Sequence, residues 1–395
     1  MSTPHPLIAA WARSAVVPRN GAFKTLHAHD IATPVLHTLL ERAGIDANAV
    51  DAVVMGNALG AGGNPARMLA LHAGLNQRCA AYTVDTQCCA GLDAVAIGAA
   101  LIASGQAHVV VAGGAEAWSR SPIRMHRPLT ADTPAEAYER PAFAPNPAQD
   151  PDMLLSAARY ATQAGYTRAQ QEAYALQSHM RATMHQAEIA KEIVPIMGIA
   201  HDVYPRHIDA ARAARMPVVA RSDAENSDDT CALSALAISA QADGAAFVLL
   251  VSPQACEQYK LTPQAEWIAH ASVGSSRGDR DDAAVAVQQR AAAVACRWAG
   301  GVADGGSAAS RSCRGSGALL LPVMFASHLI ARPIPRQASV WRTRCGACAF
   351  PAPAPNKHIG VDGPTRTGRH PGWAAPCSTG TAAPVVVLRR TTHQG

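Results

Sequence analysis

Between residues 50 and 112, short apolar segments with the pattern of buried strands alternate with longer segments that have the composition of helices. The connections between them are short and several are rich in glycine. Alternation of this kind is typical of an α/β unit with a buried sheet of the parallel type, because each helix returns the chain to the edge where the next strand begins. We therefore expect an α/β fold, with strands at residues 50–55, 82–86 and 108–112 and helices at 68–74 and 92–104.

The rest of the first 276 residues continues this pattern, with one interruption. Further strands are expected at 6–12 and 245–251, and further helices at 31–44, 167–190 and 253–257. Thr167 is the expected N-cap of the long helix. Residues 119–165 contain seven prolines, which disfavour both helices and central strands, so we expect an insertion there, and irregular chain from the long helix to about residue 230.

Cys88 lies where an expected strand runs into the N-terminus of an expected helix. A helix N-terminus carries positive potential, which stabilises a thiolate relative to a thiol and so favours a nucleophile. Backbone amides at such a turn can also hold an oxyanion. A buried cysteine that only packs is an equal alternative, and the pattern does not separate Cys88 from the adjacent Cys89.

Residues 83–95, TVDTQCCAGLDAV, resemble the nucleophile motif of the thiolases, in which Val-Asn-x-x-Cys precedes a small residue and a helix. The resemblance makes Cys88 the catalytic cysteine that is acylated and Cys89 the variable position after it. The chain departs from the motif at Asp85, where the family usually has Asn, and at Ala90, where it usually has Ser.

Four more segments resemble thiolase motifs and follow in the same order along the chain. They are VVMGNALGAGGNPAR at 53–67, AGGAEAWS at 112–119, YTRAQQEAYALQSHMRA at 166–182 and SAQADGAAFVLLVS at 239–252. In the last of these, the family's serine lies beside the pantetheine of coenzyme A, so the resemblance assigns coenzyme binding to Ser239. Ala240 and Ala242 stand where the family usually has Gly and Asn.

The resemblance covers about residues 6–276 and implies the thiolase-like fold. In that fold two similar α/β halves pack as five layers, α-β-α-β-α, with a loop domain inserted in the first half. We therefore expect the N-terminal half at 1–118, a coenzyme A-binding loop domain at 119–235, the junction of the two halves at 236–276, and an atypical region at 277–395.

The resemblance also implies an acyl-CoA:acetyl-CoA C-acyltransferase. Cys88 would take an acyl group from acyl-CoA and pass it to deprotonated acetyl-CoA, giving acetoacetyl-CoA from two acetyl groups; the reverse reaction is thiolysis of 3-ketoacyl-CoA. The implied partners are acetyl-CoA, acyl-CoA and coenzyme A, with no further cofactor and no metal, in a homodimer or homotetramer.

Residues 277–395 differ from the rest of the chain in composition. They hold 14 Arg and one Lys against five Asp and no Glu, so a net acidic body is followed by a basic tail. Arginine clusters favour phosphate, but these arginines are scattered and no recognition motif accompanies them, so we expect no nucleic-acid partner. The thiolase segments that supply the base and the second acid/base are not intact here. His370, Cys377 and the lone Cys345-x-x-Cys348 pair are interpreted as incidental.

The whole chain has 30 Arg and four Lys, a ratio that is typical of a gene with GC-rich codons. When a GC-rich gene is translated in a shifted frame, the product is rich in Arg, Ala, Gly, Pro, Ser and Cys, as residues 277–395 are. We therefore interpret the sequence as leaving the thiolase frame near Ser276. Translation of the encoding DNA in its other two frames tests this, and absence of Asn-Glu-Ala-Phe-like and His-Pro-x-Gly segments from both would refute it. Two alternatives stay open: a non-catalytic thiolase-like protein that binds acyl-CoA or lipid, and an inactive chain with a frameshifted C-terminus.

The compartment is expected to be the cytoplasm. Ten cysteines in 395 residues are too few for a disulfide scaffold. The first residues lack a cationic segment, and the longest apolar stretches fall short of a bilayer span, so we expect neither a secretory signal nor a membrane partner.

Overall fold

The computed structural model describes residues 5–272, apart from residues 61, 140, 148–149, 151 and 223–227, and also the segments 329–330, 342–343 and 385–390. Residues 283–295, where the composition favours a helix, lie outside the described residues. So do His370, Cys345, Cys348 and Cys377.

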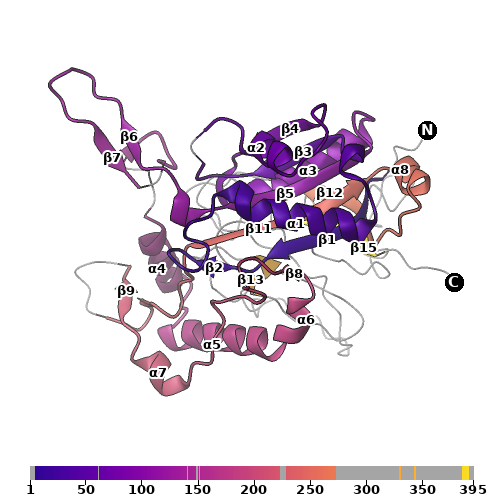
Figure 1. The fold of residues 1–395 in the computed structure, drawn as a ribbon. Coiled ribbons are helices and arrows are strands. Elements are labelled where there is room, and N and C mark those ends of the chain that lie inside the picture. The colour runs from indigo at the N-terminus through magenta and orange to yellow at the C-terminus, as the bar shows by residue number, and fades with distance from the viewer. Residues whose placement is uncertain are drawn as a thin grey trace, which may run out of the picture.

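A mixed sheet forms the centre of the described chain, with strand order β15-β12-β1-β11-β5-β3-β4 (Figure 1). β3 pairs in parallel with β4 and with β5, as the alternating pattern predicted. β11 runs antiparallel to β5 and β1, and β12 antiparallel to β1, so the expectation of a parallel-type sheet is wrong for that side. An apolar run shows that a strand is buried. It does not show from which edge of the sheet the chain enters that strand, and so it does not show whether the strand is parallel or antiparallel to its neighbours. The strand bounds are Leu7–Ser14 (β1), Ala52–Gly56 (β3), Ala80–Val84 (β4), Val109–Glu116 (β5), Ala242–Val251 (β11), Ala265–Ala271 (β12) and Val385–Arg390 (β15).

Helices cover both faces of this sheet, as neighbouring residues of β5 show. Val109 and Val111 belong to the apolar cluster that contains α1 (Ala28–Ala43) and α2 (Pro65–His72). Val110 and Ala112 belong to the cluster that contains α3 (Ala90–Ala103). Because alternate side chains of a strand point to opposite faces, α1 and α2 lie on one face and α3 on the other. Burial on both faces explains the continuous apolar runs of β5 and β11.

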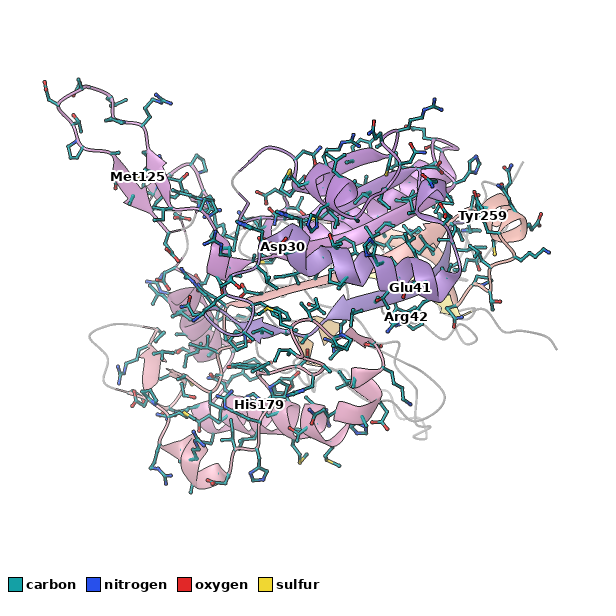
Figure 2. The ribbon with its side chains drawn as sticks, in the orientation of Figure 1. Asp30, Glu41, Arg42, Met125, His179 and Tyr259 are labelled. Atoms are coloured by element: carbon teal, nitrogen blue, oxygen red, sulfur yellow. The ribbon has the colours of Figure 1, made fainter. Side chains whose placement is uncertain are left out.

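The insertion between β5 and β11 contains more structure than its prolines suggested. The expectation that residues 119–165 hold no helix is wrong, whereas none of these residues joins the central sheet in the part of the segment that the structure describes. α4 (Met153–Gln163) starts directly after the last proline, where the Asp152 side chain accepts a hydrogen bond from the Leu155 amide. β6 (Arg124–His126) and β7 (Glu136–Tyr138) form a hairpin that projects from the body, with Met125 on its exposed surface (Figures 1 and 2).

The long helix expected in the insertion is confirmed as α5 (Arg168–Met184). Thr167 is its N-cap, and its hydroxyl and the side chain of Gln170 form a capping box. The helix ends at Met184, and a separate short helix, α6, follows. The remaining short elements of the described chain are β2 (Val17–Pro18), α6 (Gln186–Ala190), β8 (Ile193–Val194), α7 (Ala210–Ala214), β9 (Val218–Ala220), β10 (Leu233–Ser234) and α8 (Pro253–Gln258). Residues 191–230 are therefore less irregular than expected.

The C-terminal tail contributes one strand to the central sheet. β15 pairs antiparallel with β12, in a register that joins Ala265 to Arg390 and Ala271 to Val385. The prolines of the tail made a sheet hard to place there, but β15 itself, VVVLRR, is proline-free and begins with β-branched residues. β13 (Leu329–Ile330) and β14 (Arg342–Thr343) pair with each other.

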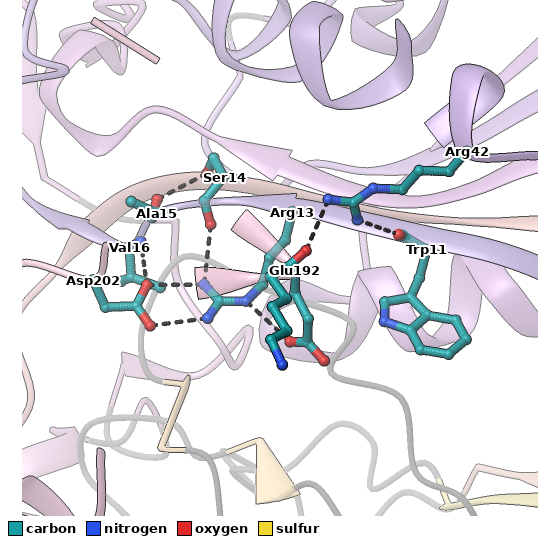
Figure 3. A network of polar contacts seen from close by, with 9 residues as sticks. Trp11, Arg13, Ser14, Ala15, Val16, Arg42, Glu192 and Asp202 are labelled. Carbon is teal, nitrogen blue, oxygen red and sulfur yellow. Dashed lines mark hydrogen bonds and ion pairs between the residues drawn. The ribbon is translucent and has the colours of Figure 1, made fainter. Parts of the chain in front are cut away.

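A buried ionic network ties β1 to the end of the insertion (Figure 3). The guanidinium group of Arg13, which is 3% exposed, donates to both carboxylate oxygens of Asp202, at 2.8 and 2.9 Å. The amide of Val16 donates to the same carboxylate, and Glu192 lies 3.6 Å from Arg13 Nε. Burial raises the pKa of Glu192. The network therefore depends on Asp202 to neutralise and hold Arg13.

Replacing Asp202 with alanine is expected to lower the free energy of unfolding by about 3 kcal/mol, because a buried guanidinium loses its bidentate partner. Asp229 offers a matched control, since its pair with Arg221 is partly exposed and its replacement by alanine should cost less than about 1 kcal/mol. Urea unfolding of both variants measures the difference. Equal losses would show that burial does not set the strength of the Arg13 pair.

None of the helices in the described part of the chain is long and apolar enough to cross a membrane.

Candidate active site

Four of the motif-bearing segments meet at one edge of the sheet. The C-terminal ends of β3, β4 and β5 share this edge because the three strands are parallel. The start of β11 lies at the same edge, since Gly244 pairs with Glu116 in the antiparallel register. Segments that are up to about 180 residues apart in the sequence are thereby brought together.

Cys88 lies in a 3-10 turn, Gln87–Cys89, between the end of β4 and the start of α3. Gln87 has a φ of 55°, in the left-handed region, and its amide donates to Asp85 Oδ1 at 2.9 Å. A non-glycine residue in this region is strained, so the surrounding contacts must hold the turn. The turn places Cys88 directly before the helix N-terminus, as the sequence predicted.

The structure separates the two adjacent cysteines. Cys88 is partly exposed, whereas Cys89 is 5% exposed. Burial raises the pKa of the Cys89 thiol far above its usual range, and Cys88 and Asp93 add to this shift. Cys89 therefore stays a protonated packing residue, and Cys88 is the thiol of the pair that a substrate can reach.

Glu116 joins the ends of β5 and β3. Its carboxylate accepts hydrogen bonds from the amides of Ala58 and Leu59, at 2.8 and 3.1 Å, and from Asn57 Nδ2 at 2.9 Å. Burial raises the pKa of Glu116 to about 7, against the hydrogen bonds that lower it, and the charge of Asp85 raises it further. Asn57 and Glu116 lie within two of the thiolase-like motifs, but neither residue was assigned a role from its motif.

The raised pKa of Glu116 predicts a pH-dependent stability. Because the folded chain holds this proton more tightly than the unfolded chain, stability falls as pH rises from about 4.5 to about 7, by about 3 kcal/mol from this group. The free energy of unfolding of the wild type, measured relative to a Glu116→Gln variant, should fall by that amount over this range. The exposed Glu139 gives the control, and a Glu139→Gln variant should show no such trend. If the difference in unfolding free energy between the wild type and Glu116→Gln did not change with pH, the raised pKa of Glu116 would be contradicted.

Asp243 joins the start of β11 to the segment after β5. It is fully buried and accepts hydrogen bonds from the Ser119 amide at 2.9 Å and the Ser119 hydroxyl at 2.5 Å. Burial raises its pKa.

Ser239, the predicted coenzyme-binding residue, is partly exposed and lies just before β11, at the same sheet edge as Cys88. β5 and β3 separate β11 from β4, which places these two strands about 14 Å apart.

No group of three or more His, Cys, Asp or Glu among the described residues is arranged to hold a metal ion.

The fold and the site define a thiol-bearing α/β protein, in which an accessible cysteine sits at a strand-to-helix turn at the edge of a helix-covered sheet. Residues 7–254 match the family model described as "Thiolase, N-terminal domain". The chain belongs to the thiolase family, which confirms the resemblance seen in its motifs.

Two relatives and one solved structure show the extent of the similarity. The acetyl-CoA acetyltransferases of Rhizobium meliloti (strain 1021) and Shinella zoogloeoides are each 33% identical over 297 residues, covering 69% of this chain and 72% of the relative. The crystal structure of the Bacillus anthracis acetyl-CoA acetyltransferase is similar with a TM-score of 0.66 and 26% identity, covering 75% of this chain and 77% of that one. The thiolase-like fold expected from the sequence is thus confirmed.

Proposed function

We propose that this chain is an acyl-CoA:acetyl-CoA C-acyltransferase that works through an acyl-cysteine at Cys88. The observation that carries the proposal is the placement of an accessible thiol at the N-terminus of α3, beside a neighbouring cysteine that is buried. Membership of the thiolase family and the names of the relatives support acetyl-CoA as a substrate.

The chemistry proposed for Cys88 is attack of its thiolate on the thioester carbonyl of acyl-CoA. The Sγ–C bond forms, the bond from carbon to the coenzyme sulfur breaks, and coenzyme A leaves as its thiolate, which takes a proton. In the second half, the carbanion of acetyl-CoA displaces Cys88, giving 3-ketoacyl-CoA and returning the thiolate. The positive end of α3 favours the thiolate and the oxyanion of the first step.

Ser239 is proposed to contact the pantetheine arm of coenzyme A. A ligand that reached from Ser239 to Cys88 would lie along the sheet edge, over the ends of β5 and β3. The division into an N-terminal half, a coenzyme A-binding loop domain at 119–235 and the regions 236–276 and 277–395 is likewise a proposal. Assembly into a homodimer or homotetramer would be tested by light scattering on the purified chain.

The experiment that tests the function is acylation by acetyl-CoA. The full chain is incubated with acetyl-CoA and digested, and the peptide that contains Cys88 is examined by mass spectrometry for an added acetyl group that hydroxylamine removes. A thioester on Cys88 supports the proposal. An unmodified Cys88, at acetyl-CoA concentrations that fully label a thiolase run in parallel, would overturn it.

The composition of residues 277–395 favours one alternative, a thiolase-like chain that lacks turnover. The second half-reaction needs a base and a second acid/base, and the family segments that supply them are not intact in that region. On this alternative, acetyl-CoA acylates Cys88 once, and the chain does not measurably consume coenzyme A in the thiolysis of acetoacetyl-CoA to acetyl-CoA. Ready thiolysis by this chain would refute the interpretation of a shifted frame.

A further inference from the structure

Asp93 connects the turn that carries Cys88 to a strand far away in the sequence. It lies near the start of α3 and is 8% exposed. The Thr86 hydroxyl donates to Asp93 Oδ2 at 2.5 Å. On its other side, His270 Nε2 of β12 lies 3.2 Å from Asp93 Oδ1.

β12 is held against α3 by packing as well as by this pair. Trp267 belongs to the same apolar cluster as Ala94 and Val95 of α3, and its ring stacks on the ring of His270 with 6.4 Å between centroids. The Nε2 atom of His270 is buried and makes no hydrogen bond within the described chain, and the Asp93 carboxylate, 3.2 Å away, is the acid that it faces. The position of His270 is therefore fixed relative to α3.

The hydrogen bond from Thr86 supports a strained backbone. Gln87, which has a positive φ, stands between Thr86 and Cys88. The flanking bonds are Thr86 to Asp93, the Gln87 amide to Asp85, and the Cys89 amide to the Thr86 carbonyl at 3.3 Å. Strain at one residue persists when its neighbours are held in this way. Loss of Asp93 would release the start of the turn.

The negative charge of Asp93 disfavours a thiolate at Cys88, and His270 is placed to balance that charge. A carboxylate so near the helix N-terminus opposes the positive potential that favours a thiolate at Cys88. Its influence already extends to Cys89, whose pKa it raises. The imidazole of His270, with Nε2 3.2 Å from Asp93 Oδ1, is the side chain placed to balance this charge. Asp85 and Glu116 also lie at this edge, and because both are acids neither can balance the charge of Asp93.

We propose that Asp93 and His270 are positioning residues for Cys88. Asp93 holds the turn through Thr86, and His270 is placed to balance the carboxylate charge that would otherwise disfavour a thiolate at Cys88. The proposal rests on the proposed function of Cys88 as the acylated residue.

The test is the pH dependence of alkylation at Cys88, measured on the full reduced chain with iodoacetamide and site-resolved mass spectrometry. His270→Gln should move the midpoint of the rate profile upward by about one pH unit, which is a tenfold slower reaction below the midpoint. Asp93→Asn should move it downward. The Asp93→Asn/His270→Gln double variant should have the midpoint of the wild type. His270→Lys should also have the wild-type midpoint, because its ammonium group can balance the Asp93 carboxylate.

Controls separate positioning from a general effect on folding. His126→Gln, on the projecting hairpin, should leave the midpoint unchanged, and thermal unfolding reports whether each variant folds. If His270→Gln loses stability but has the same midpoint as His126→Gln, the inference is overturned. Should His270→Gln not fold, Asp93→Asn decides alone, because a midpoint that does not fall contradicts charge balance.

The alkylation profile does not depend on acylation. If acetyl-CoA leaves Cys88 of the wild type unmodified, the proposed function fails, while the comparison of midpoints remains valid. If Cys88 is acylated and all variants share one midpoint, the positioning inference alone fails.

Discussion

Replacing Cys88 with alanine is expected to abolish formation of the acetyl-protein from acetyl-CoA, lowering its rate by more than about a thousandfold. The thiol is the group to which the acetyl carbon bonds, and the nearest side chains along the turn cannot take its place. Cys89 is buried and the pKa of its thiol is raised, and the Thr86 hydroxyl donates a hydrogen bond to Asp93. Intact-mass measurement after incubation with acetyl-CoA, followed by digestion, gives the rate and the position of the acetyl group.

Cys89→Ala is the matched control, because it removes the adjacent thiol and leaves the turn in place. This variant should acetylate at close to the wild-type rate. Its stability should fall by about 1 kcal/mol, since a small buried side chain is truncated. Acetylation that survives Cys88→Ala, or that is lost in Cys89→Ala while the chain stays folded, would contradict the assignment of the nucleophile.

The strands and helices around the site could be predicted from the sequence because they depend on local patterns. β5 and β11 are buried on both faces, and their apolar runs mark them without knowledge of their neighbours. α5 shows its start in Thr167, whose cap is made within one turn. The direction of β11 could not be predicted, because it depends on the path of the whole insertion. α4 was missed because prolines before a helix say little about the helix itself.

The site could be predicted only in part, for a similar reason. Cys88 was found from its place between a strand and a helix, but burial was needed to separate it from Cys89. The acids that shape the site pair with distant residues: Glu116 with the loop at residues 57–59, Asp243 with Ser119, and Asp93 with His270. No local spacing signals such pairs, since the sheet order alone brings them together.

Gly113→Ala is expected to destabilise the fold by about 3 to 5 kcal/mol. Gly113 of β5 pairs directly with Phe247 of β11. A Cβ atom at Gly113 would lie 2.1 Å from the carbonyl oxygen of Ala246 and 2.8 Å from Cα of Phe247. Both are backbone atoms of a strand that is buried along its whole length, so relief requires β5 and β11 to move apart. Urea unfolding and the melting temperature measure the loss.

Gly105→Ala separates this clash from the ordinary cost of losing a glycine. Gly105 has a φ of 73°, and a Cβ atom added there would meet nothing within 4 Å, so alanine introduces backbone strain without a steric clash. The expected cost is about 1 kcal/mol. Because Gly113 lies three residues before Glu116, its replacement should also displace that carboxylate from the amides of Ala58 and Leu59 and slow acetylation of Cys88. Equal losses of stability in the two variants would mean that close approach to β11 is not the reason for glycine at position 113.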